Sequence, residues 1–240
     1  MIKLEKRESI YFLTMDADEN RWNTTFVREI ADVLDEVEND EGPGALITSS
    51  ANTKFFSNGL DLDWMQSPES HPNGGDREVF GEEFMYLMGR MITLPIPTVC
   101  AINGHAFGAG FMFALSHDVR IMREDRGFLC ANEMQLGLPI PRPELALFKH
   151  KVPANAFFET VQLSRRWTGS EALNAGIIQG VSSLDELPEV AQSKAEELAP
   201  LANNRKNFGH QKEILYGENA AINLSHGPAH MLKNSKDFND

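Results

Sequence analysis

Segments with the pattern of β-strands alternate with segments that have the spacing of amphipathic helices, and this alternation restricts the fold more than any other feature. Residues 9–15 and 98–102 are rich in β-branched and aromatic side chains, which favour strands. From Phe26 and from Phe80, apolar residues recur every three or four positions, as on one face of a helix. We therefore predict an α/β fold. Further strands are expected at 45–48, 119–122 and 128–130, and further helices near Leu145 and at 156–163, 170–176 and 188–201.

The composition argues against several classes of function. The formal net charge of −13 is unfavourable for nucleic-acid binding, because clustered Lys and Arg bind phosphate backbones. No apolar run is long enough to cross a membrane, and the N-terminus has no secretory signal. Cys100 and Cys130 are too few for a disulfide framework, so two buried thiols are expected. We therefore expect a cytoplasmic protein that binds neither nucleic acid nor a membrane.

Two glycine-containing segments each follow a predicted strand. The first spans residues 55–62 and the second spans residues 101–110, and in each we expect a glycine turn that leads directly into a helix. A glycine turn lets the main chain approach a ligand closely, and a helix start leaves free N–H groups. Two such loops side by side could present two N–H donors to one oxygen atom. Either loop alone is better explained as an ordinary turn between a strand and a helix.

Taken together and in this order, the two segments resemble the enoyl-CoA hydratase/isomerase (crotonase) superfamily. Their residues are most similar to those of enoyl-CoA delta isomerases. The resemblance implies a spiral of β-β-α units, with an acyl-CoA-binding catalytic core over residues 1–200. It further implies a short helical segment over residues 201–240, as a candidate contact between subunits, and assembly as a homotrimer or hexamer. The motifs that carry the resemblance are Phe56-Ser57-Asn58-Gly59, Asn103-Gly104-His105-Ala106, Ser116-His117-Asp118 and Arg126-Gly127-Phe128-Leu129.

The same resemblance implies roles for individual residues. The backbone N–H groups of Leu60 and Ala109 would bind the thioester oxygen of an enolate, and the carboxylate of Glu133 would transfer protons. Coenzyme A is part of the substrate, so no separate cofactor is implied. The residues expected to contact coenzyme A are Arg21, Trp22, Ser57, Asn58, Gly59, Asp61 and Leu62, with Lys54 as a further candidate for its phosphates. The acyl tail is expected to lie near Trp64, Met65, Phe84, Met88 and Phe111.

One position departs from the hydratases of this family. They carry a second glutamate two residues beyond the small residues of the second loop, where this chain has Met112. Adding water to a double bond needs two proton-transferring groups, whereas moving a double bond needs only one that reaches both carbons. We therefore predict conversion of 3-enoyl-CoA to 2-trans-enoyl-CoA, in fatty-acid oxidation. Apolar neighbours should raise the pKa of Glu133; these are Phe107, Phe111, Met112, Met134 and Leu136.

Other functions stay open at this point. The main alternative is an enoyl-CoA hydratase or another acyl-CoA enzyme of the crotonase type, and a protein that binds acyl-CoA without catalysis is a third. No metal site is predicted, because His105 and His117 lack the spacing of a metal-binding motif.

Overall fold

Among the described residues the chain forms two β-sheets, and the fold is built around the larger one. The computed structural model describes residues 1–67, 75–219, 222–223 and 226–238. The segment 67–76, whose two prolines, two glycines and polar residues predict a loop, lies mostly outside the described residues. The sheet has six strands in the order β1-β2-β3-β5-β7-β9. β1 pairs antiparallel with β2, and the other neighbours pair in parallel. The strands are β1 (Ile2–Arg7), β2 (Ile10–Met15), β3 (Ala45–Ser50), β5 (Thr98–Ile102), β7 (Val119–Arg123) and β9 (Gly180–Ser182).

A second, three-stranded parallel sheet has the order β4-β6-β8, formed by β4 (Phe55–Ser57), β6 (His105–Phe107) and β8 (Leu129–Cys130). Each of its strands directly follows a strand of the larger sheet, so the chain alternates between the sheets before it enters a helix. This arrangement is the predicted succession of β-β-α units. It also corrects one expectation, that each glycine loop leads from a predicted strand directly into a helix. A short strand intervenes in each case, β4 between β3 and α2 (Leu62–Gln66) and β6 between β5 and α4 (Ala109–Leu115).

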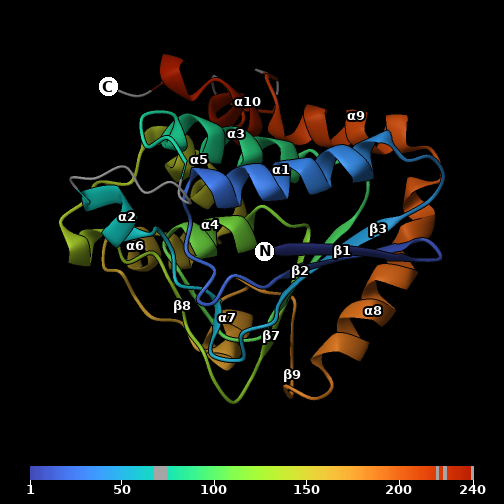
Figure 1. The fold of residues 1–240 in the computed structure, drawn as a ribbon, viewed down its shortest axis with the longest axis horizontal. Coiled ribbons are helices and arrows are strands. Elements are labelled where there is room, and N and C mark those ends of the chain that lie inside the picture. Colours follow the sequence, from blue (N-terminus) through green and yellow to red (C-terminus); the bar gives the residue numbers. More distant parts are fainter. Residues whose placement is uncertain (68–74, 220–221, 224–225, 239–240) are drawn as a thin grey trace.

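Helices cover both faces of the larger sheet (Figure 1). On one side, α1 (Thr24–Asn39) packs against α3 (Phe80–Ile92), and their buried apolar faces belong to the main core. On the other side, α8 (Leu187–Leu198) covers β3, β5 and β7 through Leu187, Ala191 and Ala195. The remaining helices near the core are α2 (Leu62–Gln66), α4 (Ala109–Leu115), α5 (Arg142–Lys151), α6 (Ala154–Val161) and α7 (Gly169–Asn174), with the 3-10 helices η1 (Glu133–Leu136) and η2 (Ala199–Ala202).

Local capping explains where several helices begin. Asn23 caps α1 by accepting a hydrogen bond of 2.9 Å from the amide of Phe26. The cap of α7 is Thr168, where the hydroxyl and the Glu171 carboxylate form a reciprocal capping box, so the helix starts one residue before the predicted range of 170–176. The strands β1 and β9 were not predicted. Alternation is interrupted in β1 by consecutive charged residues, and β9 is only three residues long.

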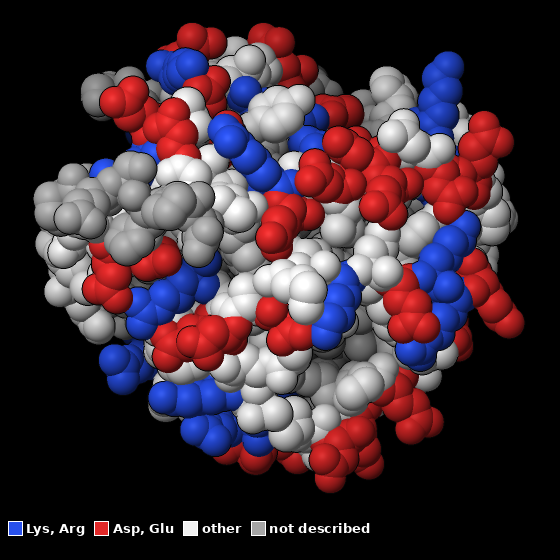
Figure 2. All heavy atoms as spheres, in the orientation of Figure 1, with Lys and Arg blue, Asp and Glu red and all other residues white. Residues whose placement is uncertain are grey.

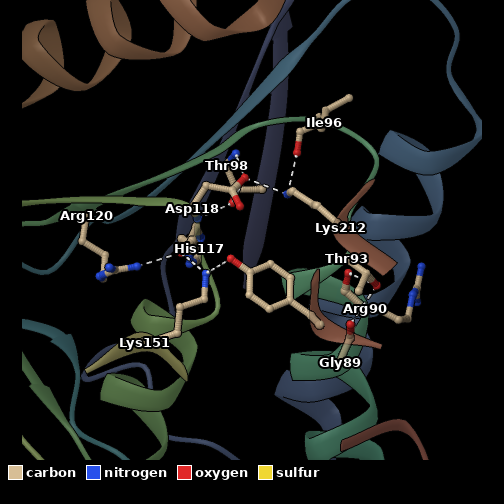
Figure 3. A network of polar contacts seen from close by, with 11 residues as sticks. Gly89, Arg90, Thr93, Ile96, Thr98, His117, Asp118, Arg120, Lys151 and Lys212 are labelled. Atoms are coloured by element: carbon tan, nitrogen blue, oxygen red, sulfur yellow. Dashed lines mark hydrogen bonds and ion pairs between the residues drawn. The ribbon is translucent and has the colours of Figure 1, made fainter. Parts of the chain in front are cut away.

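The C-terminal segment packs on the core through α9 (Arg205–Tyr216), α10 (Pro228–Lys233) and η3 (Ser235–Asp237). α10 contacts α3 and α5. Figure 3 shows how α9 is attached: Lys212 donates a hydrogen bond of 2.7 Å to Asp118 and one of 3.1 Å to the carbonyl of Ile96. Asp118 also accepts hydrogen bonds from the amide and hydroxyl of Thr98. The segment is therefore held to the starts of β5 and β7 by a largely buried ion pair.

The surface in Figure 2 carries acidic and basic side chains that are interleaved instead of forming one continuous basic patch. This distribution agrees with the net charge of −13. Within the described residues, no helix is both long and apolar enough to cross a membrane. Cys100 and Cys130 are both buried free thiols, as predicted.

Candidate active site

The two glycine loops, η1 and the start of α5 enclose a cavity of about 290 Å³. Leu60 of the first loop and Ala109 of the second both line it, and so does Glu133. Its remaining wall is mostly apolar, with side chains from α3, α4 and the crossing that leads to α5. The apolar lining residues are Leu62, Phe80, Phe84, Met112, Leu136, Leu138, Pro139 and Pro141. The tertiary structure therefore places the three predicted catalytic positions around one hollow.

The two loops touch at the points where their backbones need glycine. Gly59 has a φ of +79°, and a Cβ atom there would lie 2.8 Å from the carbonyl oxygen of Phe107 and 3.9 Å from the amide nitrogen of Ala109. Gly108 has a φ of +47°, and a Cβ atom there would lie 3.0 Å from Oε1 of Glu133. Side chains at these positions would be both strained and crowded. The close approach of the two loops thus depends on the absence of a Cβ atom at Gly59, and the approach of Glu133 to the second loop depends on its absence at Gly108.

The amides of Leu60 and Ala109 are free to bind a ligand. Neither donates a hydrogen bond to any residue in the described part of the chain. The flanking backbone of the first loop is fixed, because Trp22 donates to the carbonyl of Gly59 at 2.8 Å and accepts from the amide of Asp61 at 2.9 Å. An amide that is held in place without an internal acceptor is the kind of donor that stabilises a developing oxyanion.

Glu133 is positioned by the second loop. The amide of Gly108 donates a hydrogen bond of 2.9 Å to the carbonyl of Cys130, which joins the loop to the end of β8 just before η1. Oε2 of Glu133 is buried and has no hydrogen-bond partner among the described residues. Burial raises the pKa of Glu133, as the sequence predicted from its apolar neighbours. A carboxylate in these surroundings is a stronger base than an exposed one.

A second carboxyl group in the cavity was not predicted. Glu144, in the first turn of α5, lines the same cavity and is 8% exposed. The desolvation of its carboxyl group and the nearby charge of Glu133 raise the pKa of Glu144 to about 8. The sequence did contain a signal, since Glu144 precedes Leu147 and Phe148 by three and four residues on the buried face of α5. An acid at an apolar position of an amphipathic helix is the pattern that would have identified it.

The residues expected to contact coenzyme A divide into two groups. Arg21, Asn58, Gly59 and Leu62 line the cavity together with Leu60. Arg21 also forms ion pairs with Glu19 at 2.8 Å and with Asp63 at 3.4 Å. The second group does not line the cavity and consists of Trp22, Ser57 and Asp61.

The side chains of this second group make hydrogen bonds that fix the first loop. The Trp22 side chain is fully buried in the main core, and its Nε1 donates a hydrogen bond of 3.0 Å to the hydroxyl of Ser57. That hydroxyl in turn donates to the carbonyl of Asn20 at 2.7 Å. Asp61 caps α2 by accepting a hydrogen bond from the amide of Trp64. Because the Trp22 indole is packed in the core, Trp22 does not line the cavity, although it was expected to contact coenzyme A.

The predicted acyl-tail contacts are only partly on the cavity wall. Phe84 lines the cavity, whereas Trp64, Met88 and Phe111 are buried in the core outside it. Of the residues expected to surround Glu133, Met112 and Leu136 line the cavity. Lys54 lies over the ring of Phe55, with its Nζ 4.7 Å from the ring centroid, and does not line the cavity.

None of the histidines in the described part of the chain lines the cavity. His117 is fully buried, and its ring nitrogens lie 2.8 Å from the carbonyl of Phe113 and 2.8 Å from the hydroxyl of Thr48. Among the described residues, the one group of side chains with metal-ligating atoms close together is Glu218, His226 and His230, in the C-terminal segment.

An α/β fold of β-β-α units, with a cavity formed by two glycine loops and a partly buried glutamate, defines an enzyme of the crotonase class. Residues 5–219 match the enoyl-CoA hydratase/isomerase family, and the chain belongs to this family. It is similar to "Enoyl-CoA delta isomerase 3" of Arabidopsis thaliana, with 33% identity over 91% of this chain and 93% of the relative. It is also 34% identical to the peroxisomal "Enoyl-CoA delta isomerase 2" of the same plant, over 92% of this chain and 95% of the relative.

Solved structures share the fold. The human mitochondrial delta3-delta2-enoyl-CoA isomerase has a TM-score of 0.81, covering 98% of this chain and 87% of the human chain at 23% sequence identity. A probable enoyl-CoA hydratase from Mycobacterium tuberculosis has a TM-score of 0.80, covering 98% of this chain and 92% of its own at 25% identity.

Proposed function

We propose that this protein is an enoyl-CoA delta isomerase, which converts 3-enoyl-CoA to 2-trans-enoyl-CoA. The observation that carries the proposal is the meeting of two unpaired amides, from Leu60 and Ala109, with the buried carboxylate of Glu133 around one cavity. The two plant relatives named as delta isomerases, each aligned over more than nine-tenths of this chain, support the same reaction.

The amides supply an oxyanion hole for the thioester. Glu133 removes a proton from carbon 2, and the electron pair spreads through the double bond and the carbonyl to form a dienolate. Because the two N–H donors contact the carbonyl oxygen, they stabilise the negative charge that develops there. One carboxylate that reaches both carbons is sufficient for the whole reaction, since the proton taken from carbon 2 can be returned to carbon 4. The electrons of the dienolate then form the C2–C3 double bond and restore the thioester carbonyl, which gives the conjugated product.

The substrate carries its own coenzyme A, and the first loop and Arg21 form the side of the cavity proposed to receive it. Arg21 is the cation that lines the cavity, and the two acidic partners fix its side chain. The apolar wall formed by Phe80, Phe84 and Met112 suits an acyl chain. We place the reaction in fatty-acid oxidation, and we propose a homotrimer or hexamer. Light scattering on the purified chain would test the assembly.

Hydration of 2-enoyl-CoA is the second candidate function. The sequence argued against it because Met112 replaces an acid, but Glu144 brings a second carboxyl group into the cavity. Two proton-transferring groups satisfy the requirement for adding water across a double bond.

One experiment separates these functions. The purified protein is incubated with 3-enoyl-CoA and, separately, with 2-trans-enoyl-CoA, and the products are resolved by liquid chromatography and mass spectrometry. An isomerase forms the conjugated 2-enoyl thioester from the first substrate. If the protein forms 3-hydroxyacyl-CoA from 2-trans-enoyl-CoA and does not isomerise 3-enoyl-CoA, it is a hydratase and the proposal is wrong. Acyl-CoA binding without either product would indicate a non-catalytic binding protein.

A further inference from the structure

Glu144 is an acid in a position that the core would otherwise fill with an apolar side chain. It lies on the buried face of α5 with Leu147 and Phe148, both of which are fully buried. α5 packs against α4, and both Glu144 of α5 and Met112 of α4 line the cavity. Carboxyl groups are rarely buried unless a partner or a function compensates for the lost solvation.

No such partner is present. In the described ranges, the carboxyl group of Glu144 forms no hydrogen bond and no ion pair. Burial and the charge of Glu133 raise the pKa of Glu144 to about 8, so the carboxyl group is protonated at neutral pH. Burial raises the pKa of Glu133, whereas the pKa of Glu144 is raised both by burial and by the charge of Glu133, so Glu133 is the base of the pair. Two carboxyl groups in one cavity, one ionised and one neutral, have the arrangement of a base and an acid.

We propose that Glu144 is a second catalytic carboxyl group, which protonates carbon 4 of the dienolate that Glu133 forms by deprotonating carbon 2. This inference rests on the proposed isomerase function and changes the source of the proton that completes the reaction. It assigns the acid to a residue of α5, in the same cavity as the free amides of Leu60 and Ala109.

Over one turnover, the enzyme takes one proton from the substrate and gives one proton to it. In the first step the C2–H bond breaks and an O–H bond forms on Glu133. In the second step the O–H bond of Glu144 breaks, a C4–H bond forms, and the dienolate electrons close into the C2–C3 double bond and the thioester carbonyl. Glu133 is then neutral and Glu144 is ionised, so one proton passes from Glu133 to Glu144 before the next turnover. Substrate and product are isomers, and no oxidant or reductant is needed.

Isotope tracing in D₂O tests this route. A single turnover of 3-enoyl-CoA is carried out with excess enzyme, and deuterium at carbon 4 of the product is measured by mass spectrometry and NMR. If Glu144 is the donor, wild-type enzyme places solvent deuterium at carbon 4. Glu144→Gln keeps the size of the side chain but cannot give up a proton, so it should lower the turnover rate at least tenfold. Its residual product should carry at carbon 4 the hydrogen that Glu133 removed from carbon 2. The matched control, Glu189→Gln at an exposed position in α8, should behave as the wild type.

Two results would overturn the inference. One is wild-type product with the hydrogen of carbon 2 transferred intact to carbon 4. The other is a Glu144→Gln enzyme with wild-type rate and wild-type deuterium content. The first result needs no variant, so it holds even if the substitution impairs folding. Both differ from a failure of the proposed function itself, in which the wild-type protein would form no conjugated product.

Discussion

Glu133 of η1 and Glu144 of α5 line one cavity, although the chain between them turns through a left-handed glycine at Gly137 and a run of prolines before α5 begins. Both carboxyl groups have raised pKa values, primarily because they are desolvated, and the charge of Glu133 acts on Glu144 in addition. The pair gives the site an acid and a base, and its members can be tested separately.

The first prediction concerns the base. Glu133→Gln removes the carboxylate that takes the proton from carbon 2, so turnover should fall by a factor on the order of 10² to 10⁴. Acyl-CoA affinity should change little, because the amides of Leu60 and Ala109 remain. Isothermal titration with a saturated acyl-CoA measures binding beside the kinetic assay. Near-normal turnover in this variant would exclude Glu133 from the reaction.

The second prediction concerns the contact between the loops. Gly59→Ala places a Cβ atom 2.8 Å from the Phe107 carbonyl oxygen, so the Leu60 amide should move away from the cavity and turnover should fall at least tenfold. Gly42→Ala is the matched control, because Gly42 has a similar φ of +82° but nothing within 4 Å of the added atom. Both variants should lose about 1 kcal/mol of stability to backbone strain. Equal activity in the two would contradict the proposed role of the loop contact.

The third prediction is a bell-shaped dependence of kcat on pH. Glu133 must be ionised to act as a base, and its raised pKa means that activity is lost on acidification at a higher pH than for an ordinary glutamate. Glu144 must be protonated to act as an acid, so activity should also fall as the pH rises through about 8. Glu144→Gln should abolish the alkaline decline and keep the acidic one. An unchanged alkaline decline in this variant would assign that limb to another group.

The fourth prediction concerns the cost of burying Glu144. Its pKa is raised from 4.5 to about 8 on folding, so the folded state retains a proton that the unfolded state loses. The free energy of unfolding should therefore decrease as the pH rises between these values, by roughly 3 kcal/mol at pH 7. Urea denaturation at pH 5 and pH 7 measures this loss. Glu144→Gln should show a smaller decrease than the wild type, and an identical slope would mean that Glu144 is not buried in the folded protein.

The fifth prediction concerns the buried ion pair that attaches α9. Burial opposes the ionisation of Asp118, but the charges of Lys212 and Lys151 and the hydrogen bonds of Lys212 and Thr98 bring the pKa of Asp118 below its usual value. Asp118→Asn leaves Lys212 buried without a counter-charge and should lower the free energy of unfolding by about 3 kcal/mol. Glu197→Gln breaks the exposed pair with Lys194 and should cost less than about 1 kcal/mol. Similar losses in both variants would contradict the structural role of the buried pair.

The sequence determined most elements of the fold and, through a family resemblance, the carboxylate proposed as the base. Apolar spacing located α1 and α3, and β-rich segments located β2, β3, β5 and β7, because each pattern reflects the face that an element buries. The order of the two glycine loops, together with a family resemblance, singled out Leu60, Ala109 and Glu133. Short strands such as β4 and β6 escaped prediction, since two or three residues carry no measurable period.

Only the tertiary structure decided which of the motif residues face the cavity. Trp22 and Ser57 were both expected to contact coenzyme A, but their side chains hydrogen-bond to each other outside the cavity, which no local pattern reveals. The same is true of Glu144, an ordinary acid in the sequence of α5 until the packing of α5 against α4 removes it from water. The physical reason is that solvation, and with it the pKa of a carboxyl group, depends on residues that are distant in sequence and adjacent only after folding.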